Sequence, residues 1–166
     1  MKFRYCPDCG KPLSYRQLGD DSDVPWCDAC AKPWFPLFPS AIIALVYNDH
    51  DEVLLLRQNY ISEKFCNLVS GYIVPGETAE ECAYREIFEE VGVRVDRIEP
   101  VMTNWFAKKE MMMIGFFAHT SCRTLALSSE VDAAFWCGSS DIMSRLSDNP
   151  HSISRLLALK FLARSG

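Results

Sequence analysis

Residues 71–93 read GYIVPGETAEECAYREIFEEVGV, and this stretch decides the fold of the chain. Thr78 and Glu81 form the pattern of an N-terminal capping box, in which each residue satisfies a backbone N–H of the other. Gly92 is the type of residue that most often ends a helix in a left-handed conformation. The stretch therefore predicts a loop followed by a helix over 79–91.

Three glutamates of this predicted helix share one face. At about 100° per residue, Glu86, Glu89 and Glu90 fall within an arc of about 100°, while Ile87 and Val91 lie on an adjoining apolar face. Like charges at this spacing repel one another, so the cluster needs compensation. A hard divalent cation provides it, because carboxylate oxygens suit Mg²⁺ or Mn²⁺ and Mg²⁺ commonly links protein carboxylates to phosphates. The pattern indicates hydrolysis of a phosphoanhydride.

A solvent-exposed acidic helix face is the alternative meaning of such glutamates. The full spacing favours a metal site: Gly71, five residues, Glu77, seven residues, REI at 85–87, one residue, EE at 89–90, one residue, and GV at 92–93. This pattern resembles the Nudix box at every defined position. The resemblance implies an α/β fold, an α/β/α sandwich with a mixed sheet. It also implies a metal-dependent pyrophosphohydrolase that cleaves a nucleoside diphosphate linked to a further group.

Length and composition limit what else the chain can contain. With 166 residues and 49% apolar residues, it can build one full core and a small additional module. A net charge of −5 argues against a dedicated binder of duplex nucleic acid. Neither a bilayer-spanning apolar run nor a signal peptide is evident, and eight cysteines suit a reducing compartment. We expect a soluble cytoplasmic protein without membrane partners.

Four of the cysteines have the spacing of a zinc ribbon. Cys6 and Cys9 form one CxxC pair, Cys27 and Cys30 form another, and seventeen residues separate the pairs. Four thiolates close a tetrahedral site, so the zinc would be structural and would replace a hydrophobic core. Redox use of a CxxC pair is the alternative.

Prolines at positions 33, 36 and 39 indicate where the ribbon ends. We expect a zinc-ribbon module over 1–36 and a Nudix domain over 37–166. Apolar runs in the second domain predict strands over 41–47, 53–57, 67–74, 111–118 and 133–136, and a closing helix over 152–163. Glu130, just before the last strand, lies in a loop that could reach the acidic cluster.

A zinc ribbon directly before a Nudix domain is similar to the NADH pyrophosphatase branch of the Nudix family. This resemblance implies an NAD(H)-type dinucleotide substrate, with NAD-capped RNA as a further one, and a homodimer. The positions that match metal ligands are Ser70, Glu86, Glu90 and Glu130, with Glu89 completing the acidic cluster. Phe35 matches a base-stacking position, and Ser154 matches a substrate-contacting backbone position.

The chain departs from that branch after the Nudix box. Instead of a Ser-Gln-Pro-Trp signature it carries MTNWFAKK at 102–109, which we expect to form a loop. Asn104 could replace the glutamine, Trp105 or Phe106 the tryptophan, and Lys108 adds a charge suited to phosphate. ADP-ribose and nucleotide sugars therefore stay open as substrates. A zinc ribbon that binds RNA or protein beside a Nudix ligand sensor is an alternative from another class.

The residues suggest a mechanism. Glu86, Glu89 and Glu90 would hold one to three Mg²⁺ or Mn²⁺ ions, which lower the pKa of a bound water. Glu89 is the preferred general base and Glu130 the second candidate. Arg85 is expected to pair with Glu77 and to brace the loop against the helix.

Overall fold

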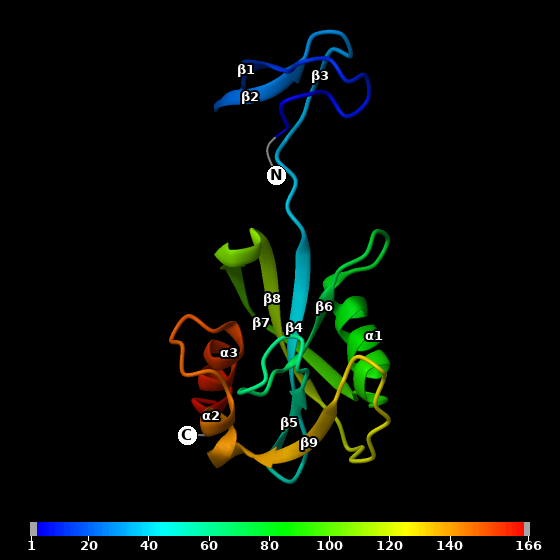
Figure 1. Ribbon diagram of the computed structural model, residues 1–166, viewed down its shortest axis with the longest axis vertical. Coiled ribbons are helices and arrows are strands. Elements are labelled where there is room, and N and C mark those ends of the chain that lie inside the picture. Colours follow the sequence, from blue (N-terminus) through cyan, green and yellow to red (C-terminus); the bar gives the residue numbers. More distant parts are fainter. Residues whose placement is uncertain (1–2, 165–166) are drawn as a thin grey trace. The chain divides into compact units, whose positions relative to one another are not determined.

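The computed structural model describes residues 3–164 and divides into two compact units, Met1–Phe38 and Pro39–Gly166 (Figure 1). Across residues 3–164, every helix is too short or too polar to cross a lipid bilayer.

The first unit is a small three-stranded antiparallel sheet with almost no apolar core. Its strands are β1 (Ser14–Leu18), β2 (Asp21–Cys27) and β3 (Lys32–Pro33), in the order β1-β2-β3. Apart from two of its cysteines, the buried apolar residues of this unit within residues 3–38 are Val24 and Pro25. So little burial cannot by itself hold a module of this size together.

The second unit is built on a six-stranded mixed sheet. Its strands are β4 (Ser40–Tyr47), β5 (Glu52–Arg57), β6 (Val69–Tyr72), β7 (Arg97–Phe106), β8 (Met111–His119) and β9 (Ala133–Gly138). They run in the order β7-β8-β4-β5-β9, and β6 also pairs with β4. The pair β4–β8 is parallel and the remaining pairs are antiparallel.

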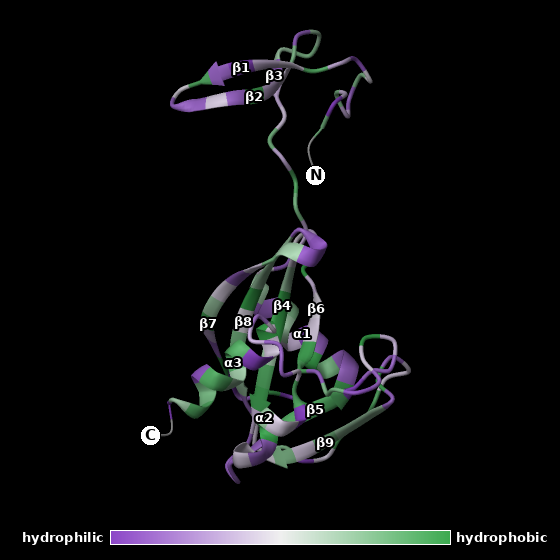
Figure 2. Cartoon of the chain, turned by 60° about the vertical axis from the view of Figure 1, so that its left-hand side comes forward, coloured by the Kyte–Doolittle hydropathy of each residue, from purple (hydrophilic) through white to green (hydrophobic). Residues whose placement is uncertain are grey.

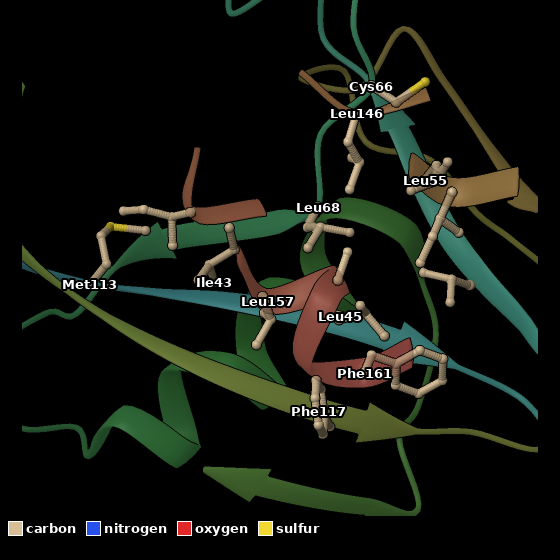
Figure 3. Close-up of a cluster of buried hydrophobic side chains, with 14 of the residues drawn as sticks. Ile43, Leu45, Leu55, Cys66, Leu68, Met113, Phe117, Leu146, Leu157 and Phe161 are labelled. Atoms are coloured by element: carbon tan, nitrogen blue, oxygen red, sulfur yellow. The ribbon is translucent and has the colours of Figure 1, made fainter. Parts of the chain in front are cut away.

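Strand β4 is buried on both faces because helices cover both sides of the sheet. On one face Ile42, Ala44 and Val46 pack with apolar residues of α1 (Ala79–Val91). On the other face Ile43 and Leu45 belong to one buried cluster with residues of α2 (Ile142–Arg145) and α3 (Ile153–Leu162). Figure 3 shows them beside Leu157 and Phe161 of α3. In the hydropathy colouring of Figure 2, β4 is largely green, which marks hydrophobic residues. The expected α/β/α sandwich with a mixed sheet is confirmed.

Helix α1 has the bounds that its local signals predicted. Glu81 N–H donates to Thr78 Oγ1 at 3.2 Å, and Thr78 N–H donates to Glu81 Oε2 at 2.7 Å. Gly92 ends the helix with a φ of 69°, which a residue with a side chain rarely adopts. The helix is therefore fixed at both ends before tertiary packing is considered.

The region after the Nudix box corrects one expectation. Residues 102–109 do not form a loop: 102–106 complete strand β7 and Ala107–Lys109 form a short 3₁₀ turn. Strand β7 lies at the edge of the sheet, and its register with β8 shifts between Pro100 and Met102. Proline is tolerated in an edge strand, because its missing N–H is not needed for pairing on the open side. Such a strand also carries polar and apolar residues without a clear period, so its sequence does not identify it as a strand.

Candidate active site

Four acidic side chains meet beside α1 in the second unit. Glu86, Glu89 and Glu90 lie on adjacent turns of the helix, and Glu130 lies in the loop before β9. Together with Ser128 and Ser129 they line a hollow of about 150 Å³. Backbone hydrogen bonds fix this loop along the helix end: Ser128 N–H donates to Glu90 O at 3.0 Å. The structure thus brings together the four predicted acids, whose individual roles stay predictions.

Glu90 is the buried member of this cluster. Its side chain is only 5% exposed, and Gln58 Nε2 donates to Glu90 Oε1 at 3.2 Å. Glu90 Oε2 is buried and has no hydrogen-bond partner among the described residues. Burial raises the pKa of Glu90 to about 7, because a carboxylate loses hydration there, although the Gln58 hydrogen bond favours the charged form.

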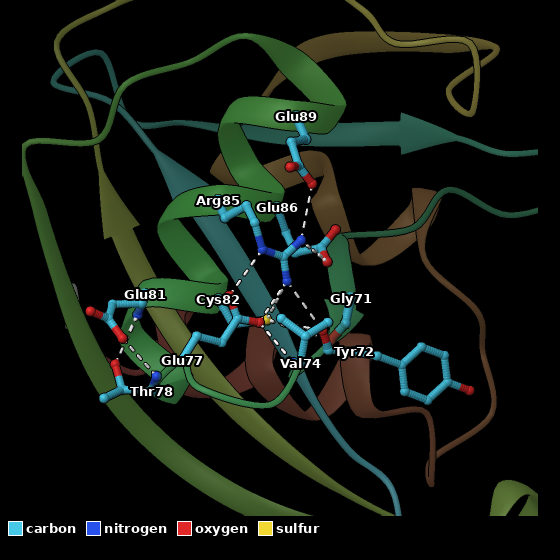
Figure 4. Close-up of polar contacts among 10 residues, drawn as sticks. All are labelled: Gly71, Tyr72, Val74, Glu77, Thr78, Glu81, Cys82, Arg85, Glu86 and Glu89. Carbon is cyan, nitrogen blue, oxygen red and sulfur yellow. Dashed lines mark hydrogen bonds and ion pairs between the residues drawn. The ribbon is translucent and has the colours of Figure 1, made fainter.

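Arg85 braces the loop against the helix, as the sequence predicted. Its Nη2 and Nε donate to the two oxygens of Glu77 at 2.7 and 3.0 Å, a bidentate arrangement (Figure 4). Glu77 Oε1 also accepts from Val74 N–H at 2.9 Å. The guanidinium lowers the pKa of Glu77 to about 2, so this ion pair persists in mildly acidic solution.

The same guanidinium offsets the charge of two more acids. Arg85 Nη1 donates to Glu86 Oε1 at 2.7 Å and to Glu89 Oε2 at 3.0 Å. Burial nevertheless raises the pKa of Glu86. Three neighbouring glutamates therefore share one cation of the protein itself, whereas the groups that favour the charged form of Glu90 are neutral: the Gln58 amide and the backbone of Ser70.

Gly71 leaves space for the Glu86 carboxyl group against β6. A Cβ atom added at Gly71 would lie 1.9 Å from Glu86 Cδ, which no pair of real atoms allows. The neighbouring Ser70 lies on β6 opposite Ile43 of β4. Gly71, the glycine that begins the Nudix box, is thus needed for the position of Glu86. It also allows the backbone of β6 to come close to the acids.

These residues fit a hard divalent cation. A buried, unpartnered carboxylate oxygen, a space kept open by a glycine and a set of oxygen donors are what Mg²⁺ or Mn²⁺ requires. Within residues 3–164, the carboxylates do not form a group whose oxygens all lie within 4.8 Å of one another. Arg85 holds two of them, so cation binding requires a local shift of Glu86 and Glu89.

The four cysteines of the ribbon, in contrast, lie close enough together to share one metal ion. Their Sγ atoms all lie within 4.8 Å of one another, with Cys6–Cys30 at 3.9 Å and Cys9–Cys27 at 3.6 Å. A tetrahedral zinc with Zn–S bonds of about 2.3 Å places its sulfurs about 3.8 Å apart. Gly10 N–H donates to Cys6 O at 2.8 Å, closing one of the two tight turns. The arrangement fits a closed tetrahedral zinc site.

The thiols also influence one another's ionisation. Although burial opposes it, hydrogen bonds from the backbone at Cys9 and Asp8 lower the pKa of Cys6 to about 6. Contacts with Cys9 and Cys27 raise the pKa of Cys30 to about 12. Four such close thiols do not all ionise by themselves, whereas a bound cation favours four thiolates.

Five further predicted site residues of the second unit do not line the acidic hollow. Asn104, Trp105 and Phe106 are on β7, and Phe106 packs against the core on the α3 side of the sheet. Lys108 is in the turn after β7, and Ser154 is in α3. Phe35 belongs to the first unit, where it is exposed.

Sequence reasoning missed two residues that the structure places at or near the site. Tyr72 directly follows Gly71, is half exposed, and has Lys109 Nζ 6.0 Å from its ring. It could have been noticed as an aromatic residue inside the Nudix box. Gln58, the buried partner of Glu90, follows strand β5 and has no local signature that would reveal it.

A family model described as the NUDIX domain matches residues 37–158. The chain belongs to the Nudix family. The NAD-capped RNA hydrolase NudC of Stutzerimonas stutzeri is 28% identical over 164 residues, covering 98% of this chain and 57% of that protein. NudC of Pseudomonas aeruginosa is 32% identical over 162 residues, covering 97% and 56%. The chain thus spans little more than half the length of these relatives.

A solved structure shares the Nudix fold. The NUDIX domain of Shewanella oneidensis NrtR, complexed with ADP ribose, matches with a TM-score of 0.66 at 20% identity. The match covers 80% of this chain and 91% of that one.

The buried Glu90 predicts a pH-dependent stability of the Nudix domain. Folding raises the pKa of Glu90 from 4.5 to about 7, so the folded form binds the proton more tightly. Its contribution is favourable below pH 4.5 and is lost as the pH rises through 7. Without added Mg²⁺ or Mn²⁺, Glu90→Gln should therefore stabilise the domain at pH 8 by roughly 3 kcal/mol, and much less at pH 4. Urea unfolding measures this.

The matched control is Glu89→Gln, because Glu89 has a 58% exposed side chain. This variant should change the free energy of unfolding little at either pH. Equal stabilisation by both variants at pH 8 would contradict the special burial of Glu90.

Gly71→Ala should displace Glu86 without unfolding the domain. The added methyl group overlaps the end of a flexible side chain, so the carboxyl group moves and the backbone does not need to. We expect Mn²⁺ affinity, measured by electron paramagnetic resonance, to fall by about 10-fold or more. Gly138→Ala is the control, because its Cβ would meet only Ser140 Oγ at 3.9 Å. Unchanged Mn²⁺ binding by Gly71→Ala would disprove the role of this space.

The thiol geometry predicts one zinc ion per chain, measured by elemental analysis. Cys27→Ser should release it, because a buried ligand of the tetrahedral set is lost. Amide resonances of residues 3–38 should then collapse while those of the Nudix domain stay in place. Retention of zinc by the variant, or loss of dispersion in both units, would count against a structural site confined to the ribbon.

Proposed function

We propose that the chain is a pyrophosphohydrolase that uses Mg²⁺ or Mn²⁺ to cleave the diphosphate bond of an NAD(H)-type dinucleotide. The observation that carries this proposal is the buried, unpartnered Oε2 of Glu90 at an acidic hollow in a complete Nudix box. The similarity to two NudC proteins, named as NAD-capped RNA hydrolases, supports an NAD-type group in the substrate.

Each acid has a separate part in the proposed mechanism. Glu86, Glu90 and the Ser70 carbonyl would hold the cation, with Glu130 reaching it from its loop. When bound, the cation neutralises diphosphate oxygens and lowers the pKa of a water molecule. Glu89 is the preferred base because its side chain is the exposed one on this helix face, with Glu130 as the second candidate. Arg85 keeps the loop and helix together through Glu77.

The proposed substrate surface lies at one end of the sheet. Tyr72 pairs with Ala41, Ala41 pairs with Met113, and Met113 pairs with Asn104, so these residues form one row. The row offers an aromatic ring for stacking and an amide for hydrogen bonds. Lys109 near the ring adds a cation suited to phosphate.

The remaining expected contacts belong to the same proposal. We expect contacts with the substrate from Trp105, Phe106, Lys108, Ser154 and Phe35, and mutation of each residue tests this.

Two further substrate classes share the cleaved bond. ADP-ribose is one, and the NrtR domain complexed with ADP ribose gives a reason to test it. A nucleotide sugar is the other. A ligand-sensing Nudix domain beside an RNA- or protein-binding ribbon is the candidate of another class.

Replacing Glu89 by Gln should lower kcat by about 10²- to 10⁴-fold. The fold and stability should stay unchanged, because the side chain is largely exposed. Steady-state kinetics with Mg²⁺ and Mn²⁺ measure this effect on NADH, NAD⁺, ADP-ribose, nucleotide sugars and NAD-capped RNA. Identification of the products by mass spectrometry shows which bond is cleaved.

Near-normal turnover of the variant would remove Glu89 as the base and leave Glu130 to be tested. Absence of hydrolysis of every compound by the wild-type protein, together with tight binding of one of them, would favour the sensor.

The proposal also includes structural zinc, a cytoplasmic location and a homodimer. Free thiols and a thiolate zinc site suit a reducing compartment. Light scattering after size-exclusion chromatography measures the oligomeric state.

A further inference from the structure

Gln58 is the buried hydrogen-bond partner of Glu90, one of the acids that line the hollow. Its side chain is 1% exposed, although glutamine is seldom buried so completely. Its Nε2 donates to Glu90 Oε1 at 3.2 Å and to Tyr60 Oη at 3.3 Å. Its Oε1 has no hydrogen-bond partner among the described residues. A buried amide that leaves its own acceptor unsatisfied in order to donate to a carboxylate requires an explanation.

Hydrogen bonds fix the backbone from which the Gln58 side chain extends. Gln58 O accepts hydrogen bonds from Ile61 N–H at 2.8 Å and from Ser62 N–H at 3.0 Å, which closes a turn after β5. On the other side, Asn59 N–H donates to Asp132 Oδ2 at 2.6 Å. Asp132 follows the Glu130 loop closely in sequence, so one anchor serves Gln58 and the loop that brings Glu130 to the hollow.

The Gln58 hydrogen bond makes the two oxygens of Glu90 different. Oε1 is held by the amide, and Oε2 is buried without a partner. A carboxyl group free to rotate would present either oxygen, or neither, to a cation. Fixing one oxygen on a rigid amide orients the other, as hydrogen bonds behind metal-binding side chains do in general.

We propose that Gln58 is a positioning residue: it holds Glu90 Oε1 so that Glu90 Oε2 is aimed at the divalent cation. This role rests on the proposed function of the acidic hollow. Gln58 does not touch substrate or cation, and it acts entirely through Glu90. Among the acids at the hollow, Glu86 and Glu89 are held by the Arg85 guanidinium, whereas the side chain that holds Glu90 is the neutral amide of Gln58.

Two variants of Gln58 test the proposal. Gln58→Met keeps the length of the side chain and removes the N–H donor, while Gln58→Asn keeps the amide but is one methylene too short to reach Glu90. In both, the dissociation constant for Mn²⁺, measured by electron paramagnetic resonance, should rise by about 10- to 100-fold. At saturating Mn²⁺, the KM for the dinucleotide should change little, because no substrate contact has been removed.

Thr120→Val is the matched control for a purely structural loss. Thr120 is fully buried, and its hydroxyl donates to Arg94 O at 2.8 Å without lining the hollow. This variant should lower the melting temperature and leave the Mn²⁺ dissociation constant unchanged. Folded Gln58 variants whose Mn²⁺ affinity stays within twofold of wild type would overturn the role of Gln58.

A crystal structure of the wild-type protein with Mn²⁺ tests the proposal without a variant, so a folding defect cannot affect the result. It should place Glu90 Oε2 on the ion while Oε1 stays on Gln58 Nε2. A Glu90 that binds the ion after turning away from Gln58 would refute the positioning role and leave the proposed function intact. Failure of the acids to bind Mn²⁺ at all would refute the proposed function itself, and the role of Gln58 with it.

Discussion

Repulsion among carboxylates on one face of α1 is the constraint on which the rest of the Nudix domain depends. A helix with three acids at these positions is tolerable only if each negative charge is offset or neutralised. Arg85 offsets two of them and is itself anchored by Glu77, which ties the loop before the helix to its middle. Glu90 cannot share this cation and is buried instead, at the cost of a raised pKa. The fixed spacing of the Nudix box therefore specifies a way of balancing charge as much as a set of metal ligands.

Elements whose signals lie close together in the sequence could be predicted, whereas those that depend on contacts distant in sequence could not. Helix α1 was predictable to the residue because its two ends are determined by contacts three or four residues apart, at Thr78 and Gly92. Strands β4 and β8 were predictable because burial on both faces leaves a continuous apolar run. Strand β7 was not, because an edge strand with polar residues and Pro100 exists only through its pairing with β8. The contact of Gln58 with Glu90 was not predictable for a related reason, because segments distant in sequence bury Gln58.

The two units illustrate different solutions to the same problem of size. The Nudix domain buries apolar residues on both faces of one sheet and needs no cross-link for its core. Besides its cysteines, the ribbon buries little more than Val24 and Pro25, so the cysteines must supply the cohesion that side-chain packing does not. Their sulfurs already lie at the spacing of a tetrahedral set, which indicates that the two turns carrying them are shaped for one shared ion.

The alternation of side chains along β6 links the acids to the proposed substrate surface. Gly71 faces α1, where it makes room for Glu86, and the next residue, Tyr72, points away from Glu86 (Figure 4). A ring stacked on Tyr72 and a diphosphate beside Glu86 would thus lie on opposite sides of one short strand. Under the proposed function, the substrate must therefore reach both faces of β6. A compact substrate with only one nucleoside would contact the acids but not the whole row from Tyr72 to Asn104. Under the proposed function, this placement on opposite faces of β6 favours a substrate that carries a group on each side of its diphosphate.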